Sequence, residues 1–304
     1  MLAAGVYPAS VTPFTPTGEV DESSLARLLA RFEAAGCAGV VLAGTNGEGP
    51  SLSAIEKRDM LRAAMASRGR LKLVLGIATP SLHEAEWLAV QSGKAGAEAV
   101  RVMPPSYFRS VTGEGVASWF LKVADASPVP LVVYNYPKMT GIRLSPQLVA
   151  RLASHPNVAG FKDSSGEVEN LEGFREAAGD RLLFVGDETL LLEALRAGWT
   201  GTISGAANVV PEWLARIVGE WASGSQVQAE TLFEVVLPVI EVVRKAPQPT
   251  SNKAVLHALG VIESPDPRLP LERADPEAVL TALSGRLGVT PPGPSRQGRG
   301  LASP

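Results

Sequence analysis

The sequence predicts an α/β fold in which eight parallel strands close into a (β/α)8 barrel, the TIM barrel, followed by a small C-terminal helical cap. Short apolar segments alternate with helical patterns along most of the chain, and glycines stand where several of those helices end. Strands of a parallel sheet are covered on both faces, so their apolar runs are nearly continuous. The eight predicted strands are residues 6–12, 38–44, 71–77, 97–103, 129–135, 157–161, 182–186 and 200–204.

The segments between the strands have the periodicity of amphipathic helices. Residues 21–36 carry leucines and Phe32 at helical spacing on one face. Ser53 and Glu56 have the spacing of a capping box, which predicts that a helix begins directly after Ser53. An open, doubly wound sheet is the alternative arrangement, and the eight strand–helix repeats favour the closed barrel.

The same patterns divide the chain into three regions. Residues 1–222 contain all the strand patterns and are predicted to form the barrel with its catalytic site. Residues 223–289 contain only helical patterns and are predicted to form a C-terminal helical bundle, which is the cap. Residues 290–304 are rich in proline, glycine and serine and are predicted to be a disordered tail.

Composition and charge exclude several classes of protein. The chain has 304 residues, 45% of them hydrophobic, and a formal net charge of −3, so it predicts neither a nucleic-acid partner nor an anionic membrane surface. The single cysteine, Cys37, allows no intramolecular disulfide and no cysteine-based metal cluster. With no signal-peptide pattern and no run of about 18 apolar residues, we expect a soluble, cytoplasmic protein.

The predicted sixth strand ends in a lysine. Residues 158–161 form an apolar run and Lys162 follows it, at the strand end where TIM barrels carry their chemistry. Low-dielectric walls would disfavour the charged amine, and a neutral lysine is a nucleophile toward carbonyl carbons. The alternative is a solvated lysine that pairs with Asp163 at the rim.

Polar residues also end the second and fifth strands. In "GTNGEG" (44–49), glycines let backbone N–H groups approach an anion while Thr45 and Asn46 add side-chain donors. A tight turn capped by Thr45 is the alternative, and the glycine spacing does not match a dinucleotide-binding loop. Tyr134 ends the fifth strand and Tyr107 lies in the fourth loop; each alternatively is a packed aromatic residue.

These motifs together resemble the dihydrodipicolinate synthase and N-acetylneuraminate lyase family. The likeness rests on "TPFTPTGEVD", "GTNGE", "PPSYF", "YNYPKMTG" and "GFKDSSG" and covers about residues 6–222 clearly. It implies that Lys162 forms a Schiff base with the keto carbon of a 2-oxo acid and that Tyr134 shuttles protons. It also implies that Thr45 relays protons between the two phenols and that Tyr107 completes the relay from a neighbouring subunit.

The resemblance also implies the residues that bind the substrate. Thr45 and Asn46 would hold the carboxylate, and Ile203 would offer its backbone carbonyl. "VGDETL" contributes an acidic pair that binds the sugar tail in the sialic-acid lyases, although a rim pair at a helix start is an equal alternative. "SGAANV" (204–209) could contact a carboxylate or a phosphate. The predicted substrate-binding residues are Thr45, Asn46, Ser164, Ile203, Gly186, Asp187, Glu188 and Gly205.

Three positions bear on which member of the family the chain resembles. Met139 stands where the lysine-biosynthesis enzyme has an arginine, whereas Asn46 and Ser164 resemble the 4-hydroxy-2-oxoglutarate aldolase branch. We therefore expect a lyase that cleaves a 4-hydroxy-2-oxo acid or a 2-oxo-3-deoxy sugar acid, with release of pyruvate or glyoxylate. The first alternative is 4-hydroxy-tetrahydrodipicolinate synthase, which condenses pyruvate with aspartate semialdehyde. A non-catalytic barrel regulator is the second alternative.

No cofactor and no metal are expected. His83, His155 and His257 are scattered over predicted helices, helix ends and the cap, so they do not converge at the barrel mouth. The expected partner is a small 2-oxo acid substrate. The family resemblance further implies a homo-oligomer, a dimer of dimers.

Overall fold

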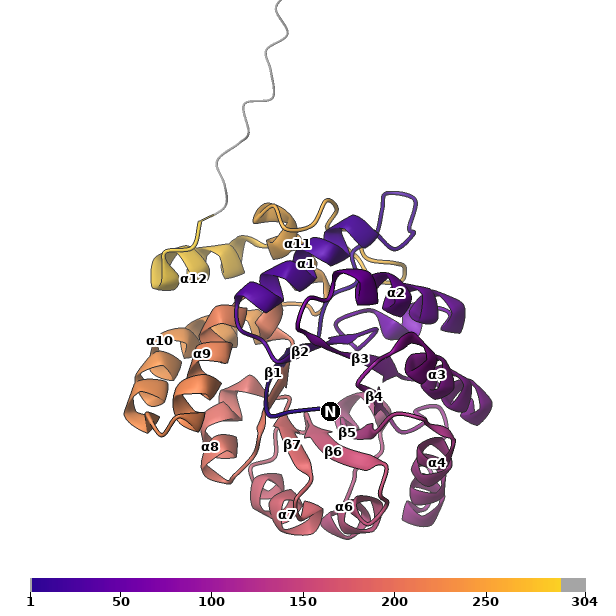
Figure 1. Ribbon diagram of the computed structural model, residues 1–304. Coiled ribbons are helices and arrows are strands. Elements are labelled where there is room, and N and C mark those ends of the chain that lie inside the picture. The colour runs from indigo at the N-terminus through magenta and orange to yellow at the C-terminus, as the bar shows by residue number, and fades with distance from the viewer. Residues whose placement is uncertain (1, 291–304) are drawn as a thin grey trace, which may run out of the picture.

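A computed structural model describes residues 2–290 and contains one eight-stranded parallel sheet in the order β1-β8-β7-β6-β5-β4-β3-β2. The backbone N–H groups of Ala38 and Ser10 donate to the carbonyls of Val6 and Val41, at 2.9 and 3.0 Å, and so join β2 to β1. The sheet therefore closes into a ring of strands surrounded by helices (Figure 1), which confirms the predicted TIM barrel. The strands are β1 (Gly5–Pro8), β2 (Gly39–Leu42), β3 (Lys72–Ile77), β4 (Ala99–Val102), β5 (Leu131–Asn135), β6 (Val158–Asp163), β7 (Leu182–Val185) and β8 (Gly201–Ser204).

Helices follow the strands and cover the outside of the barrel. The predicted capping box is confirmed, since the Ser53 hydroxyl accepts from the Glu56 N–H at 3.2 Å and the Glu56 carboxylate accepts from the Ser53 N–H at 2.8 Å. The α-helices of the barrel are α1 (Glu22–Ala34), α2 (Ala54–Ser67), α3 (Leu82–Ala95), α4 (Gly113–Ala126), α5 (Pro137–Thr140), α6 (Pro146–Ala153), α7 (Glu169–Ala178), α8 (Leu191–Arg196) and α9 (Pro211–Ala222). Three short 3-10 helices are η1 (Gly49–Ser51), η2 (Glu188–Leu190) and η3 (Ala206–Asn208).

The first and sixth strands differ in length from the prediction. After β1 the chain leaves β8 and turns toward β2, where Ser10 bonds to Val41, so the ladder ends at Pro8. By contrast, β6 continues past the predicted end, and its last two residues pair with Tyr134 and Asn135 of β5. Lys162 therefore lies within a strand, where both neighbours constrain its backbone.

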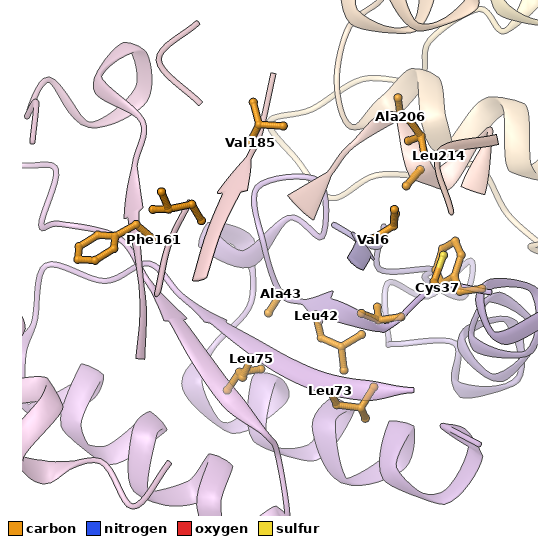
Figure 2. Packing of buried hydrophobic residues seen from close by; sticks show 14 of the residues in the cluster. Val6, Cys37, Leu42, Ala43, Leu73, Leu75, Phe161, Val185, Ala206 and Leu214 are labelled. Carbon is orange, nitrogen blue, oxygen red and sulfur yellow. The ribbon is translucent and has the colours of Figure 1, made fainter. Parts of the chain in front are cut away.

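The barrel has an inner and an outer apolar layer. Side chains alternate between the two faces of each strand, so Ala99 belongs to the inner layer while Val100 and Val102 pack under the helices. Figure 2 shows Leu73 and Leu75 of β3 in the outer layer. The inner layer consists of Tyr7, Ala9, Val41, Val74, Ala99, Val132, Phe184 and Ile203.

Three further helices pack beside the barrel: α10 (Gln226–Lys245), α11 (Thr250–Ala258) and α12 (Glu277–Leu287). In Figure 1, α10 lies along α9. The segment after α11 is bonded to α1, because Arg27 donates to the Val261 carbonyl at 3.0 Å. Apolar side chains of α10, among them Phe233 and Val236, belong to the same outer layer as the barrel helices. The division at residue 222 stays a prediction, although α9 does end at Ala222. Of the predicted tail, residues 291–304 lie outside the described residues.

None of the helices in residues 2–290 combines the length and the apolar character needed to cross a membrane.

Candidate active site

Lys162 projects into the barrel from β6. Phe161 lies in the outer apolar layer, so the alternation of the strand turns the next side chain inward. Only 5% of the lysine is exposed, and its Nζ atom lies 4.4 Å from the centre of the Tyr134 ring. Burial, and then the positive charge of Arg101, hold the pKa of this amine well below its usual range. The amine thus has the environment of a nucleophile.

Tyr134 lies beside the lysine on β5. The two residues are register partners in adjacent strands, and the Tyr134 hydroxyl donates to the Ser164 hydroxyl at 3.2 Å. Burial raises the pKa of Tyr134 to about 12, although the charge of Arg101 and the hydrogen bond with Ser164 oppose this rise. A phenol and an amine therefore share one enclosed space.

The loop after β2 has an unusual backbone. Ala43 and Glu48 both have positive φ angles, 50° and 52°, and such conformations in residues other than glycine store strain. Gly49 lies so close to the chain that an added Cβ atom would meet the Ala43 carbonyl oxygen at 2.0 Å. Asn46 in this loop accepts at 3.2 Å from the side chain of Asn252 in α11. The cap thus helps to hold the loop.

A cavity of 330 Å³ opens where these strands end. It brings together most of the predicted site residues, with both backbone and side-chain donors on its wall. The predicted residues that line it are Thr45, Asn46, Tyr134, Lys162, Ser164, Gly186, Glu188 and Gly205.

Three predicted site residues do not line the cavity. Tyr107 is 80% exposed and packs edge-on against Phe108 in the loop after β4. The side chain of Ile203 belongs to the inner apolar layer of the barrel. Asp187 binds Thr189 and Arg244. Tyr107 is thus separate from the cavity of its own chain.

The alternative in which Lys162 is a solvated partner of Asp163 is wrong. Asp163 accepts from the Asn135 side chain at 2.7 Å and from the Ser165 hydroxyl at 2.7 Å. These bonds satisfy the carboxylate, and the strand directs consecutive side chains to opposite faces. The lysine remains inside the barrel without that partner.

Glu188 and Asp187 have a partner that local sequence patterns missed. Arg244 of α10 donates to Glu188 at 2.7 Å and to Asp187 at 2.5 Å. Burial alone would raise the pKa of Glu188, but Arg244 and the hydrogen bond from Ser204 hold the pKa below its usual value. Both carboxylates are thus engaged by protein groups, which argues against the predicted contact with a polyol tail.

Arg101 and Arg244 are the two cavity residues of greatest consequence that the sequence analysis did not identify. The sequence does contain an indication of Arg101. It is a charged residue in the apolar strand β4, two residues after the inward-facing Ala99, so its side chain is also expected to face inward. For Arg244 the sequence gives no such indication, since its partners lie more than fifty residues earlier in the chain.

Within the described residues, no group of three or more His, Cys, Asp or Glu side chains is arranged to hold a metal ion.

The family model of the dihydrodipicolinate synthetase family matches residues 2–283. The chain belongs to this family. A 4-hydroxy-tetrahydrodipicolinate synthase of Methanopyrus kandleri is 33% identical over 295 residues, which cover 95% of this chain and 98% of the relative. A second synthase, from Streptomyces coelicolor, is 35% identical over 92% of both chains.

Solved structures agree with the family assignment. The dihydrodipicolinate synthase of Thermotoga maritima superposes with a TM-score of 0.89 at 27% identity, covering 95% of this chain and all of that one. The enzyme of Cyanidioschyzon merolae, solved with lysine bound, has a TM-score of 0.88 at 27% identity, with 94% of this chain and 99% of that chain covered.

These relatives establish the class of protein. The chain is a dihydrodipicolinate synthetase family enzyme of the class I aldolase type. The closer likeness to the 4-hydroxy-2-oxoglutarate aldolases gains no support, because the relatives carry the name of the synthase.

Proposed function

We propose that this enzyme forms a Schiff base between Lys162 and pyruvate and condenses the product with aspartate semialdehyde, as 4-hydroxy-tetrahydrodipicolinate synthase. The observation that carries the Schiff-base step is the buried Lys162 amine, 4.4 Å from the Tyr134 ring in a cavity at the strand ends. The choice of reaction rests on the names of the relatives at 33–36% identity.

The chemical steps balance with these residues alone. The neutral Nζ atom adds to the carbonyl carbon of pyruvate, and the carbonyl oxygen leaves as water once it has gained two protons. The imine then loses a proton from the methyl carbon, and the enamine carbon adds to the aldehyde carbon of the second substrate, which restores the imine. The amino group of the semialdehyde attacks the imine carbon, closes the ring and displaces Lys162, which leaves as the free amine. Tyr134 exchanges protons with the oxygen atoms in these steps, and Thr45 is the proposed relay.

Neighbouring groups position the reactants. Thr45 and Asn46 are proposed to hold the pyruvate carboxylate, with Ser164 orienting the Tyr134 hydroxyl. Gly186 leaves room for the side chains of Ser164 and Lys162, since an added Cβ atom would lie 1.9 Å from the Ser164 hydroxyl and 2.6 Å from the Lys162 side chain. Backbone groups of Gly186 and Gly205 face the same cavity.

The carboxylate of aspartate semialdehyde needs a cationic partner. The lysine-biosynthesis enzyme has an arginine at the position of Met139, so in this chain another residue must supply the charge. Met139 lines the cavity there, and its neighbour Lys138 is exposed on the same wall. Because Arg244 is neutralised by Asp187 and Glu188, we propose Lys138 as the group that attracts the semialdehyde carboxylate.

Met139 favours a second candidate function. Lysine lacks the two-pronged hydrogen bonding of arginine, so a second carboxylate would be bound less specifically than in an enzyme with arginine at this position. Cleavage of a 4-hydroxy-2-oxo acid or a 2-oxo-3-deoxy sugar acid, with release of pyruvate or glyoxylate, is therefore the alternative reaction at the same lysine.

Purified enzyme tests the two candidates side by side. Pyruvate followed by borohydride should add a stable adduct to the wild-type chain and none to Lys162→Ala. Turnover is then measured with pyruvate plus aspartate semialdehyde and, separately, with 4-hydroxy-2-oxoglutarate. Faster condensation supports the synthase, faster cleavage supports the second candidate, and the absence of any adduct would defeat both.

Tyr107 is proposed to act from a second subunit. Tyr107 and Phe108 form an exposed aromatic pair in the loop after β4, with ring centres 5.2 Å apart. A pair of this kind at the surface is typical of a contact with another protein. Its position off the cavity of its own chain supports a homo-oligomer in which one protomer completes the site of its partner.

A further inference from the structure

Arg101 is a buried cation in the wall of the active-site cavity. It belongs to β4, where the alternation that places Ala99 in the inner layer also directs Arg101 inward. The residue is 1% exposed, and neither its Nε nor its Nη2 atom has a hydrogen-bond partner within residues 2–290. A buried charge that lacks an acidic partner is unfavourable for folding, so its presence suggests a functional role.

Aromatic packing and two glycines accommodate the guanidinium. Its central carbon lies 4.3 Å from the centre of the Tyr134 ring, which is the geometry of a cation–π contact. An added Cβ atom at Gly76 would lie 3.0 Å from Nη2, and one at Gly44 would lie 3.6 Å from it. The backbone of β3 and of the β2 loop thus leaves the space that the guanidinium occupies.

The ring that carries Arg101 also carries the amine of Lys162. The Nζ atom is 4.4 Å from the same ring centre, so two cationic groups contact one phenol. Like charges this close disfavour each other, and only the lysine can relieve the repulsion by losing its proton.

Other charged groups near Lys162 come from three directions. Arg244 of α10 is a second positive charge, whereas Glu188 after β7 and Asp163 on β6 itself favour a protonated lysine. The charge of Arg244 is balanced by its contacts with Glu188 and Asp187. Arg101 has no such contact through the two atoms named above, so its field at the amine is the less compensated one.

We propose that Arg101 is a positioning residue whose guanidinium, without an acidic partner within residues 2–290, favours the neutral amine of Lys162 and the deprotonated phenol of Tyr134. In both cases the fixed positive charge favours the deprotonated form, because it opposes an ammonium group and stabilises a phenolate. The inference rests on the proposed Schiff-base function, since it concerns how the lysine becomes nucleophilic. Arg101 acts through these two side chains.

The test compares Arg101→Met, which removes the charge, with Arg101→Lys, whose buried amine can itself lose its proton. The rate of borohydride trapping with pyruvate is measured from about pH 6 to about pH 10. For Arg101→Met we expect the midpoint of the pH profile to rise by about one unit, which means an approximately tenfold slower reaction at neutral pH. The rate should recover at alkaline pH, and the midpoint of Arg101→Lys should lie between those of Arg101→Met and wild type, because a buried lysine carries its charge only part of the time.

Arg181→Met is the matched control. Arg181 is half-buried and donates to the backbone carbonyls of Ala153 and His155, so its removal deletes a comparable side chain away from the cavity. Its pH profile should match that of wild type, and circular dichroism checks the fold of each variant. If Arg101→Met does not fold, Arg101→Gln provides the same loss of charge with a planar polar head.

The outcomes distinguish the role of Arg101 from the proposed Schiff-base function. An unmoved midpoint in a folded Arg101→Met enzyme, or a loss of rate that alkaline pH does not recover, would show a purely structural role and overturn the inference. Failure of wild-type enzyme to form any adduct over the whole pH range would instead overturn the proposed function.

Discussion

Lys162 is held in a setting that raises its reactivity and lowers the stability of the fold. The amine is buried against Tyr134, and its pKa lies well below the usual value because of burial first and Arg101 second. In the unfolded chain the same amine would bind a proton up to about pH 10.5. The unfolded state therefore binds more protons between the two pKa values, and the free energy of unfolding rises with pH in that window.

Replacing this lysine should stabilise an inactive enzyme. Lys162→Met removes the amine while keeping a flexible apolar side chain, so we expect a gain of about 1 kcal/mol at neutral pH, or a rise in melting temperature of about 2 °C. Thermal unfolding measures this. The gain should disappear above about pH 10.5, where the lysine is neutral in both states. The control is Lys122→Met on the exposed face of α4, and a destabilised Lys162→Met would contradict the argument.

At the scale of elements, the cap holds the loops of the site. Lys253 of α11 and Glu48 of the β2 loop form an ion pair of 2.7 Å in which both side chains are fully buried. Glu48 also accepts from the backbone N–H of Arg268, and Lys253 also donates to the Asp266 carbonyl. The strained loop that carries Thr45 is thereby bonded to two segments of the C-terminal region.

Breaking this buried pair should be costly. Lys253→Met leaves the Glu48 carboxylate buried without its partner, which typically lowers the free energy of unfolding by about 3–5 kcal/mol. Chemical denaturation measures the loss, and Glu48→Gln combined with Lys253→Met should recover part of it. Arg62→Ala, which removes the solvent-exposed contact with Asp59, is the control and should change stability little. Equal effects of the buried and the exposed change would contradict this account.

The first turn of α2 should show an acid-sensitive contribution. Contact with Arg268, followed by hydrogen bonds with Ser53, lowers the pKa of Glu56 from 4.5 to about 2. A depressed carboxyl pKa stabilises the fold above the unfolded value, and this contribution is lost as the pH falls from 4.5 toward 2. The melting temperatures of wild type and Glu56→Gln should therefore converge in that range. A constant difference down to pH 2 would contradict the assignment.

At the scale of the whole molecule, the aromatic pair of Tyr107 and Phe108 is the feature that a single chain leaves unexplained. Both side chains are exposed, while the other proposed catalytic residues line one cavity. If Tyr107 serves a neighbour, the protein works as an oligomer. One related structure is described as the first monomeric dihydrodipicolinate synthase variant, so the family itself does not decide the matter.

Mixing two inactive variants tests sharing between subunits. In a hybrid of Tyr107→Phe and Lys162→Ala protomers, one of two sites would combine an intact lysine with an intact partner tyrosine. Random mixing of dimers should then restore about a quarter of wild-type activity. Mixing Lys162→Ala with Lys162→Met should restore none. If the first mixture stays inactive while exchange of subunits is verified by mass spectrometry, Tyr107 does not act across an interface.

The chemistry should not depend on a metal. Within residues 2–290 the cavity wall presents two amines, two guanidinium groups, hydroxyls and amides, and its one carboxylate, Glu188, is paired with Arg244. We expect dialysis against EDTA to leave turnover unchanged, with a zinc-dependent enzyme as the positive control. A loss of activity that added metal restores would contradict the expectation.

Local patterns determined the barrel and the positions of its reactive groups. Continuous apolar runs of strand length, helices of period 3.6 and a capping box at Ser53 depend on neighbours along the chain, so one sequence suffices to find them. Lys162 and Tyr134 could be predicted because the carboxyl ends of the strands line the active site of a TIM barrel. The meeting of Lys162, Tyr134, Thr45 and Asn46 at one cavity follows from that geometry.

Only the tertiary structure decided which charges meet. The pairing of Arg244 with Asp187 and Glu188, and that of Lys253 with Glu48, join segments far apart in the sequence, and no periodicity encodes such contacts. Two nitrogens of Arg101, Nε and Nη2, have no hydrogen-bond partner within residues 2–290, and this too is invisible in the sequence, because it depends on every element that packs around the residue. Charge–charge energies depend on distance and burial in three dimensions, whereas strand and helix propensities act over a few residues.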